Sequence, residues 1–133
     1  MGYLHGKNVL VTGSSRGIGR AIAQRLAREG AAVGVTYAGN AEKARQVVGE
    51  IEAGGGRAFA TQADMRDLGQ VRAMFDAAAE RLGPLDVFVH NAAGVNVFKP
   101  TADMTVDDYD SMFLITRGCY FALQEAARRL RDG

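Results

Sequence analysis

The residues Thr12-Gly13-Ser14-Ser15-Arg16-Gly17-Ile18-Gly19 decide how the rest of this chain is interpreted. They follow a short apolar run, Val9-Leu10-Val11, which is typical of a buried strand, and they open a run with helical periodicity. Glycine is needed where the backbone turns tightly, where an anion touches the main chain and where a helix packs closely on a strand. The free N–H groups and the dipole of the following helix attract negative charge. This stretch therefore predicts a cradle for nucleotide phosphates.

The spacing of the glycines makes the pattern specific. A lone pair of glycines would fit any strand-to-helix turn, but Gly13-x-x-x-Gly17-x-Gly19 lies between a predicted strand and a predicted helix, which is the context that the motif requires. A Walker-type phosphate loop is disfavoured because no Lys followed by Ser or Thr comes after these glycines. A nucleotide site is therefore favoured over a plain structural turn.

Predicted strands and helices alternate along the whole chain. Ile18, Ile22 and Leu26 recur at helical spacing, and Gly30 ends that helix. Further runs predict strands at 7–12, 32–37, 57–62 and 85–90, and helices at 41–53, 67–82 and from residue 109 onward. The chain is therefore built from four strand-helix units.

Strands that alternate with helices of this length pair in parallel through right-handed crossovers. We therefore predict one domain over residues 1–133 of the α/β class, an open and doubly wound parallel sheet with helices on both faces. Ligands bind such sheets at the carboxyl ends of the strands. The Gly-rich turn, Asp64 and the stretch from Asn91 to Gly94 each follow a predicted strand, so we expect them to meet at one rim.

The composition disfavours several classes of function. The chain has 133 residues, of which 47% are hydrophobic and 23% charged, and its formal net charge is +1. Because charges of both signs are interleaved, nucleic-acid binding is disfavoured. One cysteine, Cys119, and no signal-like start or long apolar stretch predict a cytoplasmic chain that does not enter a membrane. No spacing of side chains indicates a metal site.

The whole chain resembles the amino-terminal half of a short-chain dehydrogenase/reductase, a family of nicotinamide-dependent Rossmann enzymes. The resemblance rests on the Gly-rich turn, on Asp64-Met65 and on Asn91-Ala92-Ala93-Gly94, in the order of the family. It implies a Rossmann-type sheet with the strand order 3-2-1-4. It also implies that Asp64 accepts a hydrogen bond from the adenine amino group and that Asn91 and its neighbours approach the cofactor ribose. From the residues alone, Asp64 has an alternative role as a helix N-cap, although Asp67 fits that role better.

The choice of cofactor depends on charge at the end of the second strand. An acidic residue there would accept bonds from the ribose of NAD and repel a 2′-phosphate, but the position holds Tyr37. Arg16 offers a cation to the phosphate, and Asn40 opens the next helix close by. We therefore predict a preference for NADP(H), with NAD(H) as the alternative. Without the family context, Arg16 would equally be a solvated turn residue and Tyr37 a half-buried strand end.

The predicted cofactor site draws on four segments of the chain. It comprises Gly13, Ser14, Ser15, Arg16, Gly17, Ile18, Gly19, Tyr37, Asn40, Asp64, Met65, Asn91, Ala92, Ala93 and Gly94.

The resemblance also implies catalytic residues that cannot be placed here. The family uses a Ser and a Tyr-x-x-x-Lys, but only Tyr3 has a lysine at that distance, Lys7, and this pair precedes the first strand. The sequence shown stops where the family begins its fifth strand. The family also has an Asn three residues before a glycine in the long final helix, and Ile115 takes that place before Gly118. We assign no catalytic residue and interpret His90 as structural.

Three functions stay open on these residues. The first is part of an oxidoreductase that acts on a carbonyl or alcohol, such as a small molecule or an acyl thioester, and that is inactive without its second half. The second is a regulator that binds a dinucleotide without catalysis. The third is an interaction protein that pairs through the free edge of strand 85–90, where only Asp86 is charged.

The final helix and the loop before it bear on partners and substrate. We expect either a homo-oligomer or a second chain that covers strand 85–90. The helix carries an apolar stripe, which we expect to pack mostly on the chain's own sheet rather than on a neighbouring subunit. The stripe contains Phe113, Thr116, Tyr120, Leu123, Ala127 and Leu130, and the loop expected beside the substrate contains Asn96, Val97, Phe98 and Pro100.

Overall fold

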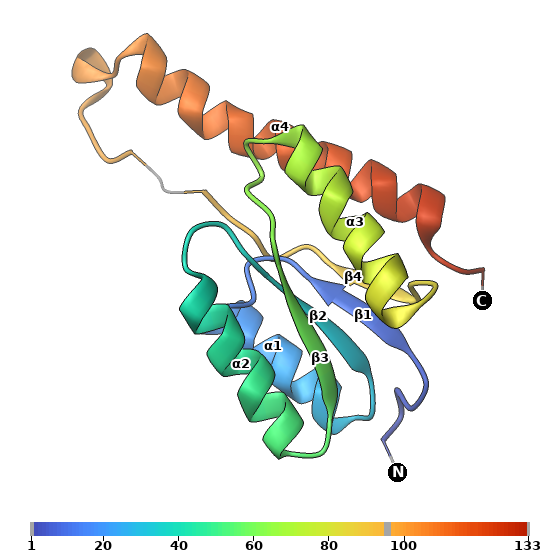
Figure 1. Ribbon diagram of the computed structural model, residues 1–133. Coiled ribbons are helices and arrows are strands. Elements are labelled where there is room, and N and C mark those ends of the chain that lie inside the picture. Colours follow the sequence, from blue (N-terminus) through green and yellow to red (C-terminus); the bar gives the residue numbers. More distant parts are fainter. Residues whose placement is uncertain (1, 95–96, 133) are drawn as a thin grey trace.

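The computed structural model describes residues 2–94 and 97–132 (Figure 1). Parallel strands β1 (Asn8–Val11), β2 (Ala32–Tyr37), β3 (Arg57–Gln62) and β4 (Val87–Val89) form one sheet in the order β3-β2-β1-β4. They alternate with α1 (Gly17–Arg28), α2 (Ala41–Ala53), α3 (Leu68–Leu82) and α4 (Val106–Arg129), and a short turn of 3-10 helix, η1 (Thr101–Asp103), precedes α4. The predicted fold class and strand order are confirmed.

The sheet has α1 and α2 on one face and α3 and α4 on the other (Figure 1), and each face has its own apolar core. On one face α1 and α2 pack on Val9, Val11, Val33 and Val35, and on the other α3 and α4 pack around Leu10 and its neighbours. All three apolar residues of β1 are fully buried. This explains why the sequence of β1 is a continuous apolar run, and it places the turn that follows β1 at the centre of the sheet's rim.

Side chains of the residues before three of the helices satisfy the first N–H groups of those helices. Asn40 accepts from the Lys43 N–H, Asp67 accepts from the N–H groups of Gly69 and Gln70, and Thr105 forms a capping box with Asp108. The capping box starts α4 at Val106, which is three residues earlier than the sequence pattern predicts.

β4 is shorter than predicted and spans three residues. Before it, Asp86 exchanges backbone and side-chain hydrogen bonds with Asn8, and after it the backbone turns toward the end of β1. Among the described residues only β1 pairs with β4, so its other edge is open. Beyond α4 the chain returns to this open edge, where the Arg131 N–H donates to the Leu85 carbonyl oxygen at 2.9 Å and its guanidinium binds Asp86.

The prediction for the apolar stripe of α4 is wrong. The helix buries a face of small residues, Gly118, Ala122 and Ala126, while Tyr120 and Leu123 are more than half exposed. A Cβ at Gly118 would overlap the Met65 carbonyl oxygen, so the helix backbone lies directly on the loop after β3. The small face packs inward because it permits this close approach, and the large side chains therefore point outward.

No helix in the described part of the chain is both long enough and apolar enough to span a membrane.

Candidate nucleotide-binding site

A cavity of about 680 Å³ lies at the carboxyl ends of the strands. The Gly-rich turn after β1 and the segments after β2, β3 and β4 all contribute to its wall, as the topology predicts. The predicted site residues in the wall are Gly13, Ser15, Arg16, Gly17, Ile18, Tyr37, Asp64, Met65, Asn91, Ala92, Ala93 and Gly94. Ser14, Gly19 and Asn40 are not in the wall, and each has a supporting role instead.

The Gly-rich turn depends on its glycines for two different reasons. Gly13 and Gly17 adopt positive φ angles of 61° and 57°, which other residues rarely tolerate. Gly19 needs its missing side chain, because a Cβ there would overlap the Gly13 carbonyl oxygen. Ser14 is buried, and its hydroxyl donates to the Val11 carbonyl oxygen and accepts from the Thr36 N–H. The turn is thus fixed from within.

Thr12 and Asn91 join the ends of β1 and β4. The buried Thr12 Oγ1 accepts from the backbone N–H groups of Asn91 and Ala92 at 3.0 and 2.9 Å. The Asn91 side-chain amide donates to the carbonyl oxygens of Thr12 and Gly13. The Asn91 amide is therefore committed to holding the turn, and the backbone after β4 is held beside the cavity.

No side chain of the first turn or the N-cap compensates the partial positive charge at the N-terminus of α1. Its N-cap residue, Arg16, makes no side-chain hydrogen bond to the helix, and the first turn holds no acidic residue. The first N–H groups of the helix therefore lack both an intrahelical acceptor and a capping side chain. Because Arg16 and Gly17 line the cavity, the positive end of α1 opens into it. This arrangement is suited to an anion.

The end of β2 carries no acidic group at the cavity. Tyr37 lines the wall, followed by Ala38. Asn40 lies one step further, where its side chain accepts from the Lys43 N–H at 3.0 Å and caps α2. A phosphate group at the end of β2 would meet no carboxylate from that strand, and Arg16 lines the same cavity.

The end of β3 brings Asp64 and Arg66 to the wall together. The Arg66 Nη2 lies 2.7 Å from Asp64 Oδ2, and the Arg66 N–H donates to Oδ1 at 2.9 Å. The side-chain hydrogen bonds from Arg66 hold the pKa of Asp64 below its usual value, although partial burial opposes this shift. Asp67 is the N-cap of α3, so that alternative for Asp64 is wrong and the Asp64 carboxylate stays at the cavity.

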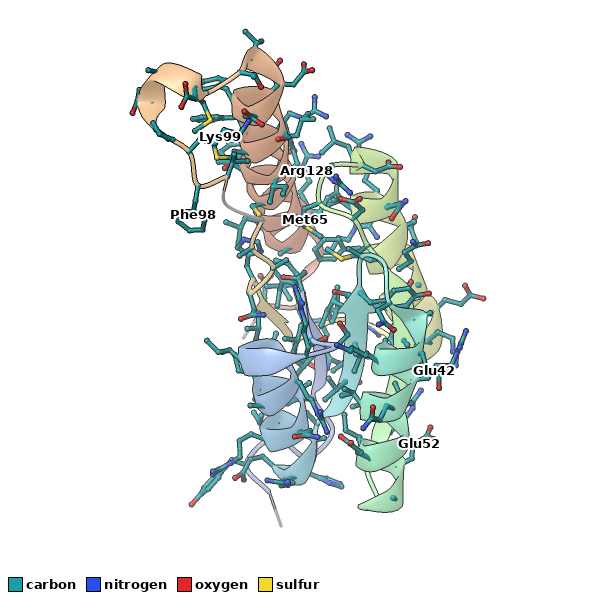
Figure 2. The ribbon with its side chains drawn as sticks, turned by 90° about the vertical axis from the view of Figure 1, so that its left-hand side faces the viewer. Glu42, Glu52, Met65, Phe98, Lys99 and Arg128 are labelled. Carbon is teal, nitrogen blue, oxygen red and sulfur yellow. The ribbon has the colours of Figure 1, made fainter. Side chains whose placement is uncertain are left out.

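Sequence reasoning missed part of the wall. Ala38 lies inside the predicted segment 37–40, but Ala63 only adjoins Asp64 and Arg66 carried no motif signal. Ser111 and Ile115 come from α4, with Ile115 packed against Gly94 so closely that a Cβ there would lie 2.5 Å from its Cδ1. The packing of α4 on Met65, which Figure 2 shows beside this helix, sets which α4 residues reach the cavity.

The loop after β4 contributes Val97 to the wall. Asn96 of the predicted substrate loop lies outside the described residues. Phe98 points away from the molecule and is 91% exposed (Figure 2). Of the described residues in this loop, Val97 is therefore the one that meets the cavity.

The imidazole of His90 and the thiol of Cys119, both near the rim, are partly buried and contact neighbouring residues of the chain. His90 Nδ1 lies 3.4 Å from Thr12 Oγ1, and burial lowers the pKa of its imidazole. Burial also raises the pKa of the Cys119 thiol, whose Sγ lies 3.8 Å from the Ala92 carbonyl oxygen. Among the described residues, no cluster of three or more His, Cys, Asp or Glu could hold a metal ion.

Known proteins are similar to this chain in sequence and in fold. The family model for short chain dehydrogenases matches residues 7–132. A short chain dehydrogenase/reductase of Aspergillus novofumigatus is 48% identical over 99% of this chain and 50% of its own length. Versicolorin reductase of Emericella nidulans is 45% identical over 98% of this chain and 49% of its own length.

A solved structure of the same family is similar to this chain in fold. A short chain dehydrogenase of Burkholderia cenocepacia, crystallised with NADP, is 48% identical with a TM-score of 0.91, over 97% of this chain and 53% of that chain. The chain thus spans about half the length of the proteins that it matches. With the family model covering nearly all of its residues, the chain belongs to the short-chain dehydrogenase family.

Proposed function

We propose that this chain is the NADP(H)-binding part of an oxidoreductase that interconverts a carbonyl and an alcohol. The observation that carries the proposal is the uncapped N-terminus of α1, which opens into the same cavity as the non-acidic end of β2. The first feature suits a pyrophosphate and the second suits a 2′-phosphate. The Burkholderia relative, which carries NADP, supports the same choice of cofactor.

Different residues of the cavity bind different groups of the cofactor in this proposal. The N–H groups at the start of α1 bind the pyrophosphate, and Arg16 meets the 2′-phosphate near Tyr37. Asp64 accepts from the adenine amino group, and the backbone from Asn91 to Gly94 borders the nicotinamide ribose. The bound cofactor would supply hydride chemistry, while the residues named here bind and orient it.

We propose that this chain turns over little by itself. Reduction of a carbonyl needs a group that protonates the nascent alkoxide. The only Tyr-x-x-x-Lys pair in the sequence, Tyr3 and Lys7, lies before β1, with Tyr3 fully in solvent and Lys7 paired to Asp86. We therefore assign the proton donor to residues beyond this chain. The substrate is a small carbonyl or alcohol, with an acyl thioester as one candidate.

The open edge of β4 favours a second half over a stand-alone regulator. The chain after α4 is already hydrogen-bonded to Leu85 beside that edge. A strand that continues from this point, or a strand of another chain, could therefore pair with β4. The exposed large side chains of α4 support assembly with a further copy or chain. A cytoplasmic location stays a prediction.

Titration of the chain with NADPH and NADH, followed by nicotinamide fluorescence, tests this function. We expect NADPH to bind at least tenfold more tightly, because the 2′-phosphate gains a charge-assisted hydrogen bond from Arg16. Arg16→Ala should remove most of that preference and leave NADH affinity nearly unchanged. Arg72→Ala, which removes an exposed arginine of α3, is the matched control. Equal or tighter binding of NADH by the wild-type chain would contradict the proposed cofactor.

A further inference from the structure

Arg66 and Asp64 form an unusually complete pair in the cavity wall. The Arg66 Nε lies 3.0 and 3.1 Å from the two Asp64 carboxylate oxygens, and Nη2 lies 2.7 Å from Oδ2. The Arg66 backbone N–H adds a contact of 2.9 Å to Oδ1. One residue thus directs three donors at one carboxylate from both its main chain and its side chain.

The segment that carries this pair is fixed on both sides. The Asp64 N–H donates to Gln70 Oε1 on α3 at 2.9 Å, and the Asp67 N–H donates to the Asp64 carbonyl oxygen at 3.0 Å. Asp67 in turn caps α3. The direction of the Asp64 carboxylate is therefore set by the fold and by Arg66 together.

The pair also determines the net charge of the cavity wall. Among the described residues that line the cavity, Asp64 is the one carboxylate, and Arg16 and Arg66 are the two guanidinium groups. A free carboxylate would repel a ligand that carries several phosphates. Arg66 neutralises Asp64, while Arg16 forms no ion pair within the described residues and stays available to a phosphate.

The pattern of donors leaves one acceptor position on the carboxylate. An ionised carboxylate offers about four lone-pair positions. Oδ1 receives both the backbone N–H and Nε of Arg66, whereas Oδ2 receives Nη2 and a share of the same Nε. The remaining position on Oδ2 can accept one further donor from a ligand in the cavity.

We propose that Arg66 is a positioning residue for base recognition, which holds Asp64 so that Oδ2 accepts an exocyclic amino group of the cofactor base. This rests on the proposed function. It makes the site select adenine over hypoxanthine, whose carbonyl oxygen at the same position cannot donate to Asp64. Arg66 acts through Asp64 and makes no contact with the 2′-phosphate.

The test compares NADPH with nicotinamide hypoxanthine dinucleotide phosphate, which has the same charge but lacks the amino donor. We expect the wild-type chain to bind NADPH at least tenfold more tightly than this analogue, because an amino group bound to a carboxylate is a charge-assisted hydrogen bond. Arg66→Ala should reduce that ratio to about threefold or less, and Arg66→Lys should restore part of it. Because the two ligands carry equal charge, electrostatic repulsion cancels in the ratio.

A double-mutant cycle with Asp64→Asn separates positioning from direct contact. If Arg66 acts through Asp64, Arg66→Ala has no further effect on the ratio in the Asp64→Asn background. In the wild-type background it weakens the binding of both NADPH and NADH, and of NADPH somewhat more, because the unpaired Asp64 carboxylate also repels the 2′-phosphate. A ratio that Arg66→Ala leaves unchanged would overturn the inference. So would a loss of affinity confined to NADPH, which would indicate contact with the 2′-phosphate. Arg72→Ala is again the control, and unfolding by urea confirms that each variant is folded.

The two proposals fail in different ways. A wild-type chain that binds neither NADPH nor NADH would overturn the proposed function and this inference with it. A wild-type chain that binds NADPH but does not distinguish it from the hypoxanthine analogue would overturn this inference alone.

Discussion

The side chains of the Gly-rich turn and those on the outer face of α4 differ in how far they are buried and bonded within the chain. At the turn, the hydroxyl groups of Thr12 and Ser14 are buried and hydrogen-bonded. On α4, the side chains of Tyr120 and Leu123 are 66% and 51% exposed, and the ring of Tyr109 stacks on Phe113 of its own helix, with 4.4 Å between the centroids. The turn is complete within this chain, whereas large apolar groups of α4 have no core to enter.

This difference separates a binding site from an interface. Groups that preorganise a site are held by bonds within the chain, so the site can bind before any partner arrives. Clustered apolar side chains in solvent usually mark a surface that another protein covers. The contrast predicts that substitutions at the turn affect folding and cofactor binding, and that substitutions on the outer face of α4 affect association.

The largest expected effect is that of Gly19→Ala. The new Cβ would overlap the Gly13 carbonyl oxygen and crowd the Asn91 side chain, and backbone atoms cannot rotate away. We expect a loss of about 3 kcal/mol or more in the free energy of unfolding, measured with urea, together with loss of NADPH binding.

Gly49→Ala is the matched control, because this glycine also lies inside a helix but a Cβ there would meet no atom within 4 Å. Alanine at that position should stabilise the chain by about 0.5–1 kcal/mol. Equal stability of the Gly19 and Gly49 variants would contradict the close packing of the turn.

Thr12→Val tests the junction between β1 and β4. Valine keeps the shape of threonine but leaves the N–H groups of Asn91 and Ala92 without their acceptor. We expect a cost of about 1–3 kcal/mol in the free energy of unfolding and weaker cofactor binding. Thr61→Val on β3, at a half-buried position, should change stability by about 0.5 kcal/mol or less. An equal loss in the free energy of unfolding for both variants would mean that Thr12 does not hold the ends of β1 and β4 together.

The fold was predictable because its signals are local. Apolar runs and glycine positions placed β2, α2 and β3 at their observed bounds. Strict alternation of strands and helices predicted a parallel sheet, and the family resemblance supplied its strand order. The predicted site residues that reach the cavity lie at the carboxyl ends of strands or in the segments just after them, so the topology brought them together.

What the sequence could not provide depends on contacts between distant segments. The orientation of α4 follows from the approach of Gly118 to Met65, and a periodic pattern does not reveal which of two apolar faces makes such an approach. Ser111 and Ile115 were therefore not predicted as wall residues. An arginine two residues from an aspartate is common in turns, and its function is visible only once both face the same cavity.

Substitutions on the outer face of α4 should separate association from stability. Tyr120→Gln and Leu123→Gln introduce glutamine, a good helix former, and remove apolar groups that are more than half exposed. We expect the free energy of unfolding to change by less than about 1 kcal/mol, while self-association in sedimentation velocity falls. A loss of stability as large as that of Thr12→Val would mean that this face packs inside the chain after all.

The smallest expected effect concerns His90 and pH. Because burial lowers the pKa of its imidazole, the unfolded chain takes up a proton near the usual pKa of about 6.5, and the folded chain takes it up only at a lower pH. The stability that His90 contributes is therefore complete above about pH 6.5 and is lost as the pH falls through the lower pKa of the folded state. Urea unfolding between pH 8 and pH 5 should show a smaller decline for His90→Gln than for the wild-type chain. This window lies above the pH at which most carboxylates titrate, so that difference reports the imidazole. Parallel declines would show that the ring beside Thr12 titrates as freely in the folded chain as in the unfolded one.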